Sequence, residues 1–440
     1  MNRTNLSEPL WFADEVNKTE HLKRITNVID IKQYLLRLHE VLQRKDFSFK
    51  NETYTTAKIV LNTLKSILNF HTSYVIGNPI SISGEPDAVR VFNKIYKKGI
   101  YTKVDYQIVN DLYTYGNAFE YVYLHDGLIK SKIIANEDSF PVYDDDFNYV
   151  AFVEHWEDME SGHSNYIVYS PTMVEVYVDN AKTNEYNNLS GLPIHYCMLD
   201  KTEYNFFGDS MMNDLIPIMN QIELLLSKLD DAITTLSLNP IGVSDGQRIN
   251  ESIPRDIVGT TINLEDGGSF KWVNAEMDYE NIKLLLDSLT QQLYAVAGVP
   301  ASVIGQGNIS NVSEVSLKLL FTQTDNKAKQ TTQVLKEGFY KRFEYFRKLL
   351  AMQGISLSDD GYDSLDITFN VNRPVDTQSL INELKTQYDI GAISRQTIID
   401  ISPYTTDTSL ELQRIEAELG TRTSETLISS QDTNEGLPNW

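Results

Sequence analysis

Hydrophobic side chains recur at helical spacing along three long segments of the chain, residues 208–238, 278–297 and 312–352. Steps of three and four residues place such side chains on one face of a helix, so each segment is predicted to be an amphipathic helix. Pro217 lies near the start of the first segment and marks a first turn or a kink. The stripe of the first segment comprises Leu215, Ile218, Met219, Ile222, Leu225, Leu226, Leu229, Ile233 and Leu236, and that of the second comprises Ile282, Leu285, Leu286, Leu289, Leu293 and Val296.

The N-terminal half alternates between the two regular patterns. Residues 21–70 have helical spacing, whereas SYVIGNPISISG (73–84) is β-branched and broken by Gly-Asn-Pro, which predicts a strand and a turn. Residues 106–156 begin with helical spacing and continue as short alternating runs. His125-Asp126-Gly127 and Asp144-Asp145-Asp146 lie between these runs, where hairpin turns are expected.

Shorter elements are predicted in the rest of the chain. Strand-like alternation continues to about residue 196. TINLEDGGSFKWV (261–273) has two strand-like halves around Asp266-Gly267-Gly268, which is typical of a hairpin. DITFNVNRP (366–374) is predicted to be a strand, and residues 376–419 to be short helices. The last segment, 421–440, is polar and is predicted to be a mobile tail.

The connection between the second and third long helices is unusual. GVPASVIGQGNISN (298–311) contains three glycines, one proline and no charged residue. Ordinary helix connections have about 2–8 residues, so this one is long as well as neutral. Its composition favours a flexible loop whose side chains form hydrogen bonds without carrying charge.

Charge is abundant and unevenly distributed. The chain has 440 residues, of which 41% are hydrophobic and 22% charged, so it is not disordered as a whole. Its net charge of −23 disfavours a simple DNA-binding module, since such modules carry excess lysine and arginine. Residues 208–297 hold 14 acidic and 5 basic side chains, whereas residues 311–352 hold 8 basic and 4 acidic ones.

The sequence also bears on the cellular compartment. Cys197 is the single cysteine, so no disulfide can form within the chain, which fits a reducing environment. No apolar run approaches the about 20 residues that span a bilayer. MNRTNLSEPLWFADEV at the start lacks the features of a signal peptide. We therefore expect a soluble protein that is made inside the cell.

Motifs for catalysis or cofactor binding are missing. There is no G-x-x-x-x-G-K-[ST] phosphate loop, and Gly305-Gln306-Gly307 lacks the third glycine of a dinucleotide fingerprint. EHWEDMESGH (154–163) is open to two interpretations, a divalent-cation site or a solvated turn between strands. The HExxH spacing of a zinc hydrolase is absent there. We expect no catalytic residue, no metal and no cofactor.

Five stretches, taken in order, resemble the portal proteins of tailed double-stranded DNA phages, of the type found in siphoviruses of Gram-positive bacteria. Each motif alone is weak, and their joint order carries the resemblance. They are SYVIGNPI (73–80), YTYGNAFEYVYLHDG (113–127) followed by ANEDSFPVYDDD, EYNFFGDSMMNDLIPIMNQIELLLSKLDDAI (203–233), LYAVAGVPASVIGQGNISNVSEVSLKLLFTQTDNKAK (293–329) and DITFNVNRPVDTQSLINELKTQYDIGAISRQTIIDISPYTTDTSLELQRIEAE (366–418).

The resemblance implies an α+β fold with the parts of a phage portal. It has an α/β wing, a two-helix stem, a small β-containing clip, a long wing helix and a helical crown. The implied boundaries are wing 1–207, first stem helix 208–238, clip 239–276, second stem helix 277–298, tunnel loop 299–312, long wing helix 313–354, crown 355–420 and mobile tail 421–440.

The same resemblance implies a function. The protein would form a homo-oligomeric ring of twelve subunits at one capsid vertex of the virion, assembled in the host cytoplasm. Double-stranded DNA would pass through the ring without sequence-specific binding. The implied partners are the terminase large subunit, the scaffold and major capsid proteins and a head-completion adaptor, with no membrane. Two alternatives stay open: another phage structural component, of the tail or baseplate, and a metal-dependent hydrolase using the acidic clusters.

Candidate site residues follow from the implied parts. The tunnel-loop candidates are Ser302, Gly305, Gln306, Gly307, Asn308, Ser310 and Asn311. The acidic candidates for lining the channel are Asp278, Glu280 and Asp287, and the candidate clip contacts for terminase or adaptor are Asp245, Arg248, Asp256, Glu265 and Asp266. The acids are equally compatible with a merely solvated helix face, and the loop with a plain connector.

The basic third helix is a further candidate. Its cations could bind acidic neighbours in the ring, be simply exposed, or face packaged DNA. They are Lys336, Lys341, Arg342, Arg347 and Lys348.

Overall fold

The computed structural model divides the chain into two compact units. The first comprises Met1–Asn311 and Leu317–Asn372, and the second comprises Val312–Ser316 and Arg373–Trp440. The residues that the structure describes are 6, 8–49, 52–144, 146–202, 206–234, 241–245, 267–273, 278–300, 319–373, 377–402, 404–405 and 411–418.

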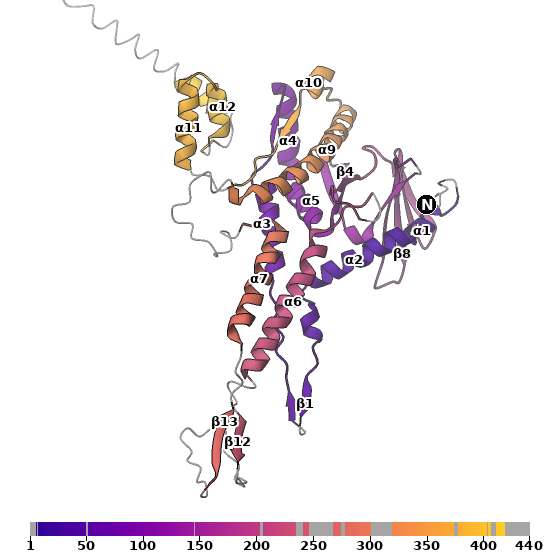
Figure 1. Cartoon of the computed structure of the whole chain (residues 1–440). Helices are drawn as coiled ribbons and strands as arrows, with labels where there is room; N and C mark the ends of the chain where they lie inside the picture. Colours follow the sequence, from indigo (N-terminus) through magenta and orange to yellow (C-terminus); the bar gives the residue numbers. More distant parts are fainter. Residues whose placement is uncertain are drawn as a thin grey trace, which may run out of the picture. The chain divides into compact units, whose positions relative to one another are not determined.

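The first unit begins with helices and one small hairpin (Figure 1). The prediction that residues 21–70 are helical is therefore wrong at this hairpin, which interrupts the helices. The strand predicted within 73–84 is confirmed only for Ser81–Ser83, because the buried side chains of Tyr74, Val75 and Ile76 complete a helix instead. Packing there overrides the strand preference of these residues. The elements are α1 (Trp11–Val16), α2 (Thr19–Leu35), the 3-10 helix η1 (Glu40–Gln43), β1 (Phe47–Phe49), β2 (Glu52–Tyr54), α3 (Thr63–Ile76), β3 (Ser81–Ser83), α4 (Pro86–Gly99) and α5 (Tyr101–Tyr115).

Two antiparallel sheets follow, as the alternating pattern predicts. One has the strand order β10-β9-β8-β7-β6 and the other β11-β4-β5. Both predicted turns are confirmed. Asp126 (φ 50°) and Gly127 (φ 73°) are successive left-handed residues that join two strands. The strands are β4 (Asn117–His125), β5 (Leu128–Ile134), β6 (Ser139–Tyr143), β7 (Tyr149–Glu157), β8 (Ser164–Tyr169), β9 (Met173–Val178), β10 (Ala181–Asn187) and β11 (Ile194–Cys197), and the 3-10 helix η2 (Asn136–Asp138) precedes β6.

The long helices are confirmed, although the first begins at Met211 and not at the predicted residue 208. Pro217 lies inside the first of them. The third is described as a helix from residue 319 except for a turn at Phe321, so the predicted start at 312 lies outside the described residues. The strand predicted over 366–374 is confirmed for three residues only, because its partner β3 is itself three residues long. The elements are α6 (Met211–Ala232), β12 (Ile241–Asp245), β13 (Ser269–Val273), α7 (Tyr279–Ala297), α9 (Thr322–Met352), α10 (Asp359–Asp363) and β14 (Asp366–Thr368).

The second unit is helical where it is described, as predicted. It contains α11 (Thr377–Asp389), α12 (Arg395–Ile401) and a helical stretch at 411–418. Ser394 caps α12, since its hydroxyl oxygen accepts a hydrogen bond from the Thr397 amide at 3.2 Å. The predicted tail, 421–440, lies outside the described residues.

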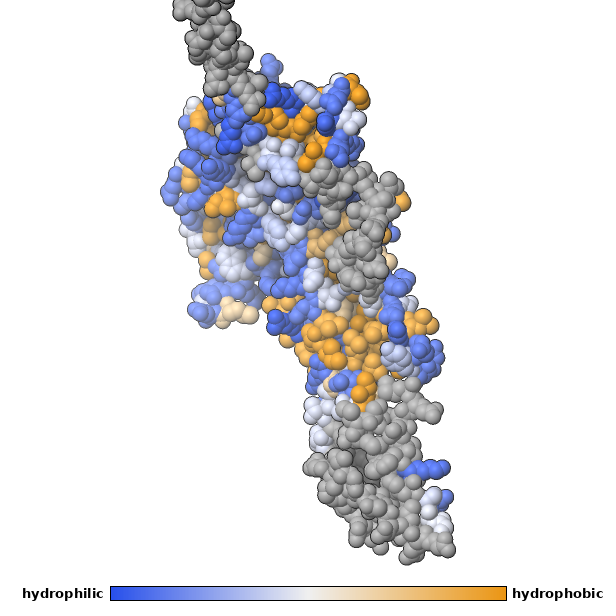
Figure 2. All heavy atoms as spheres, turned by 90° about the vertical axis from the view of Figure 1, so that its left-hand side faces the viewer, coloured by the Kyte–Doolittle hydropathy of each residue, from blue (hydrophilic) through white to orange (hydrophobic). Residues whose placement is uncertain are grey.

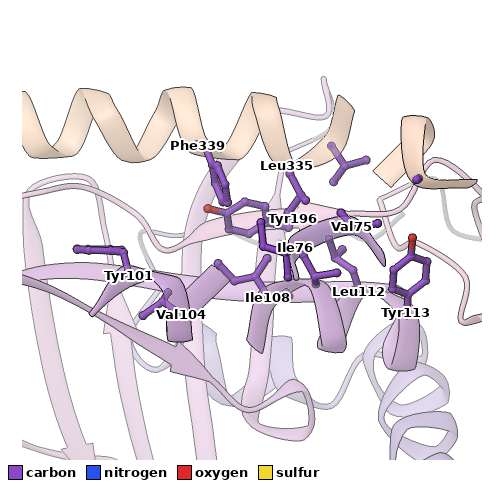
Figure 3. Packing of buried hydrophobic residues seen from close by; sticks show 14 of the residues in the cluster. Val75, Ile76, Tyr101, Val104, Ile108, Leu112, Tyr113, Tyr196, Leu335 and Phe339 are labelled. Atoms are coloured by element: carbon purple, nitrogen blue, oxygen red, sulfur yellow. The ribbon is translucent and has the colours of Figure 1, made fainter. Parts of the chain in front are cut away.

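The main core of the first unit lies where α9 crosses the other helices and the small sheet. Figure 3 shows Leu335 and Phe339 of α9 pointing toward Tyr196 of β11, with Ile108 and Leu112 of α5 beneath. Gly338 permits this approach, because a Cβ atom there would lie 2.1 Å from the Tyr196 ring. The core therefore depends on a missing side chain as much as on the aromatic ones.

A buried ion cluster fixes α9 to this core. The Arg342 guanidinium donates hydrogen bonds to Asp105 of α5 (2.6 Å), to Glu120 of β4 (3.0 Å) and to the Tyr96 hydroxyl of α4 (2.9 Å). Tyr196 donates to the same Glu120 carboxylate at 2.6 Å. Burial raises the pKa of Asp105 to about 6, although Arg342 opposes this shift. A single cation thus joins two helices and a strand to the long helix.

This cluster corrects one expectation for the basic third helix. Arg342 is completely buried and therefore cannot contact a neighbouring subunit or DNA. The other four cations are on the surface, and each forms an ion pair within the chain. Lys336 pairs with Asp366, Lys341 and Lys348 with Glu344, and Arg347 with Asp359.

We predict that Arg342→Met destabilises the first unit strongly. The substitution leaves Asp105 and Glu120 buried without a cation, which typically costs about 3–5 kcal/mol. Lys341→Met is the control on the same helix, because its exposed ion pair contributes about 0–1 kcal/mol. Thermal unfolding followed by circular dichroism compares the two variants. Equal melting temperatures would show that the cluster does not hold α9.

Candidate functional site

The helix pair α6–α7 is held to the rest of the unit by a row of polar side chains on α6. Glu223, Ser227 and Asp231 are spaced four residues apart and so lie on one side of the helix. Their side-chain oxygens accept hydrogen bonds from the backbone amides of Leu61 (2.8 Å), Ile59 (2.9 Å) and Ala57 (2.7 Å), respectively. Residues 56–61, here called the strap, therefore run along α6 as an extended segment.

The upper end of this row is a buried pair. The His39 Nδ1 atom lies 2.8 and 2.9 Å from the two carboxylate oxygens of Glu223, and both side chains are almost fully buried. Tyr34 stacks on the His39 ring, with centroids 3.9 Å apart. Further down, Arg44 donates to the Asp231 carboxylate at 2.6 Å. The row thus joins η1, the strap and α6 through charge-assisted hydrogen bonds.

The other helix of the pair, α7, is fixed at its C-terminal end. Its last carbonyl groups have no partners within the helix. Lys327 donates to the carbonyl of Val296 (2.9 Å), His71 to that of Ala297 (2.8 Å) and Thr324 to that of Gly298 (2.6 Å). Gly298 has φ 73°, the left-handed conformation that glycine commonly adopts directly after a helix. These three hydrogen bonds thus fix the position at which the chain leaves α7.

His71 is held in its neutral form. Burial lowers the pKa of His71 to about 4, and nearby Lys327 lowers it further, whereas the hydrogen bond to the Ala297 carbonyl opposes the shift. The hydrogen bond to a carbonyl requires a proton on Nε2. His71 therefore acts as a donor to the helix end, not as a proton-transfer group.

The acidic channel candidates lie on α7. Asp278 is the N-cap residue, and its carboxylate accepts a hydrogen bond from the Asn281 amide. Glu280 and Asp287 are exposed, and seven-residue spacing places them on the same side of the helix. Neither has an ion-pair partner among the described residues. Capping of the helix thus accounts for Asp278, whereas the exposed carboxylates of Glu280 and Asp287 are available to contact another molecule.

Of the candidate residues in the clip and the tunnel loop, the structure describes only Asp245. Asp245 ends β12 and pairs in register with Ser269 of β13, so these two strands form a ribbon. The predicted hairpin around Asp266-Gly267-Gly268 is described only in its second half, which pairs with β12. The other clip candidates, Arg248, Asp256, Glu265 and Asp266, lie outside the described residues. The tunnel-loop candidates Ser302, Gly305, Gln306, Gly307, Asn308, Ser310 and Asn311 lie outside them as well.

The acidic segment 154–163 comprises the end of β7 and the turn that leads to β8. Glu154 binds Lys132 and Tyr169, at 2.6 and 3.0 Å, whereas Asp158 closes the turn by accepting hydrogen bonds from Glu160 and Ser161. These carboxylates thus have protein partners. No group of three or more metal-ligating side chains that could hold an ion occurs among the described residues. The interpretation as a turn is favoured over that of a cation site.

The single thiol is a poor nucleophile. Burial raises the pKa of Cys197, while the Lys201 ammonium, 2.9 Å from the sulfur, opposes this shift. A raised pKa keeps the group as a thiol near neutral pH. Among the described residues, no helix has both the length and the apolarity needed to cross a bilayer.

A family model described as "Phage portal protein, SPP1 Gp6-like" matches residues 14–425. The chain belongs to this portal protein family. A portal protein is a virion component that forms a ring-shaped channel at one capsid vertex, through which double-stranded DNA is packaged and ejected. The predicted family and α+β fold are thus confirmed, and the portal is favoured over a tail or baseplate component.

The solved structures to which this chain is similar include components of gene transfer agent (GTA) particles. "Neck of empty GTA particle computed with C6 symmetry" has 10% identity and a TM-score of 0.48, and covers 79% of this chain and 88% of its own. "Neck of native GTA particle computed with C12 symmetry" has 11% identity, a TM-score of 0.47 and coverages of 77% and 89%. "Virion of native gene transfer agent (GTA) particle" has 11% identity, a TM-score of 0.46 and coverages of 85% and 97%. No curated protein matches.

Sequence reasoning missed the residues that fasten the portal's helix pair. The four-residue spacing of Glu223, Ser227 and Asp231 is visible in the sequence and indicates a polar row beside the apolar stripe. Their partners are backbone amides of the strap, which no side-chain pattern identifies. His71 and Thr324 are also far in sequence from the helix end that they bind, at 226 and 26 residues from their respective partners.

We predict that His71 contributes to the pH dependence of portal stability. Its folded pKa of about 4 lies below the ordinary value of 6.5, so the unfolded chain binds the proton first as the pH falls. Stability associated with His71 is thus complete above pH 6.5 and is lost as the pH falls toward 4. His71→Gln keeps a donor but does not titrate, so its melting temperature should fall less between pH 7 and 4.5 than that of the wild type.

Thermal unfolding at several pH values checks this prediction. His195 serves as the comparison, because burial lowers its pKa to about 3 and its own contribution persists in the His71 variant. Parallel pH profiles for wild type and His71→Gln would contradict the prediction.

Proposed function

We propose that twelve copies of this portal protein form the ring, with the α6–α7 pair as the stem beside the DNA. The β12–β13 ribbon belongs to the clip in this arrangement. The terminase large subunit docks on the clip during packaging, and a head-completion adaptor replaces it later. Scaffold and major capsid proteins contact the wing. The portal itself catalyses no reaction, and the packaging ATPase is a separate protein.

The exposed acids of α7 carry the proposal. Glu280 and Asp287 lie on one side of the helix, whereas Lys283 is its only cation. A wall of lysine and arginine would bind phosphates, and each contact would add affinity that opposes sliding. Carboxylates repel the duplex along its whole length, so the DNA can move past them. This property is what a conduit requires.

The neutral loop is the second element of the proposed channel. Residues 299–312 follow directly from the α7 end that His71, Thr324 and Lys327 hold. Gln306, Asn308 and Asn311 can exchange hydrogen bonds with water or DNA without strong attraction. Repeated around a ring, these loops form a narrow uncharged collar that resists back-slippage of packaged DNA.

We predict that Glu280→Lys/Asp287→Lys reduces DNA packaging by roughly tenfold or more, because every subunit then offers phosphates two cations. The control is Glu157→Lys/Glu160→Lys, which changes the charge equally on the β7–β8 connection. The measurement is the fraction of DNA-filled particles in cells complemented with each variant. Equal packaging by both variants would place the α7 acids away from the channel.

We predict that Gln306→Arg and Asn308→Arg impair packaging or the retention of packaged DNA. An arginine in the collar would bind the duplex backbone, whereas Gln306→Asn preserves the neutral polar character. Nuclease protection of the packaged genome measures retention. Unchanged packaging and retention in both arginine variants would count against a loop that faces the DNA.

Particle mass tests the ring itself. Mass photometry and negative-stain imaging of the purified chain, with and without its scaffold, should show rings of about a dozen subunits. A chain that stayed monomeric even with scaffold present would overturn the proposed assembly.

A further inference from the structure

Two apolar patches on the first unit are exposed and have no partner among the residues that the structure describes. On α7, Leu284 and Leu285 are 67% and 48% exposed, and we name them the α7 patch. Figure 2 shows apolar side chains gathered on this side of the helix pair. The second, here the α2-end patch, comprises Leu36, Leu38 and Leu42, which are 67%, 62% and 40% exposed. Clusters of exposed leucine typically mark interaction surfaces.

The backbone holds the α2-end patch in its exposed position. Arg37 adopts a left-handed conformation (φ 71°) directly after α2, and the Leu38 amide donates back to the Gln33 carbonyl at 3.0 Å. The next residue, His39, is buried against Glu223. This sharp reversal and the buried histidine together leave Leu36 and Leu38 on the outside.

The two patches lie on opposite sides of α6. The polar row on α6 faces η1 and the strap, since Glu223 binds His39, and Glu40 binds Asn220 at 3.0 Å. α6 also contacts α7. Figure 1 shows α7 on one side of α6 and the α2–β1 region on the other. The α7 patch and the α2-end patch thus flank the same helix.

The patches also lie at a similar depth along the helix pair. Glu223, which anchors the α2-end patch through His39, is as far in sequence from Met211 as Leu285 is from Ala297. Met211 and Ala297 are the ends at which α6 and α7 enter the body of the unit. Because every helical residue adds the same rise, Glu223 and Leu285 lie about equally far from the body.

Equal depth is what a closed ring requires. Subunits of a ring are related by rotation without translation along the axis, so surfaces in contact must lie at the same height. Ring contacts also join two different surfaces of the same chain. A scaffold or adaptor would need only one patch, whereas a second copy of this chain uses both.

We propose that the α7 patch of one subunit packs against the α2-end patch of the next subunit. The proposal rests on the proposed ring with the helix pair along its axis. Leu285 lies about 200° around α7 from Asp287, whereas Leu284 lies between Leu285 and the acidic side, about 60° from Asp287. Leu285 therefore faces the neighbour and the acids face the channel, with Leu284 at the boundary between the two sides.

Two complementary variants test this pairing. Leu284→Glu/Leu285→Glu removes the α7 patch, and Leu36→Glu/Leu38→Glu removes the α2-end patch. Each variant alone should lose rings at least tenfold relative to wild type in mass photometry, because a head-to-tail contact needs both surfaces. Mixed together, they should form heterodimers and stop there, since the mixture contains one intact pairing that cannot propagate.

Controls separate this proposal from the ring itself. Leu199→Glu introduces the same charge at an equally exposed leucine of the body and should form rings. Circular dichroism shows whether each variant is folded. Intact rings in either double variant, or folded variants without heterodimers in the mixture, would overturn the pairing while leaving the ring function in place. Wild-type chains without rings, even with scaffold, would overturn the ring on which the pairing rests.

Cross-linking supplies a test that does not remove apolar surface. In a Cys197→Ser background, Leu38→Cys combined with Leu285→Cys should give a ladder of disulfide-linked oligomers under oxidising conditions. Each single-cysteine variant should give at most dimers. The absence of a ladder from assembled rings of the double-cysteine protein would contradict the pairing.

Discussion

The position of α9 depends on one buried cation. Arg342 lies where α4, α5 and β4 meet the long helix, and it satisfies carboxylates from two of them at once. Charge buried in this way specifies a single arrangement, because any shift of α9 along its axis would leave Asp105 or Glu120 without a counter-ion. Gly338 and the Tyr196 ring set the distance between α9 and the sheet. Arg342 thus fixes the position of α9 along its axis, whereas Gly338 and Tyr196 fix its distance from the sheet.

The helix pair inherits its position from this core. Thr324 and Lys327 belong to α9, and they bind the last carbonyls of α7, while His71 reaches the same end from α3. On the other side, the polar row of α6 fastens the strap and η1. The two helices are therefore attached by different means: α7 at one end, and α6 along its length. This arrangement holds the helix pair while side chains on its surface, such as Glu280 and Leu285 of α7, remain exposed.

Much of this fold could be predicted from periodicity, because the apolar stripes of α6 and α7 are long and regular. Arg342 illustrates what periodicity leaves open. Among five cations of the third helix it appeared as exposed as the others, yet Phe339, Phe343 and Phe346 place it on the apolar face. The spacing of these phenylalanines could therefore have predicted that Arg342 is buried. The strap, by contrast, could not be predicted, since its contacts are made by backbone amides. The tunnel loop and most clip candidates stay predictions from the sequence.

The attachment of α7 has a mechanical consequence. Three consecutive carbonyls, those of Val296, Ala297 and Gly298, are bound by side chains from two separate helices. A force on the chain just beyond Gly298 is therefore shared by three hydrogen bonds loaded together, and none has to bear it alone. Lys327 also places positive charge at the negative end of the α7 dipole. The C-terminal end of α7 is thus held by two helices at once, and a pull on the chain beyond Gly298 is transmitted to both α3 and α9.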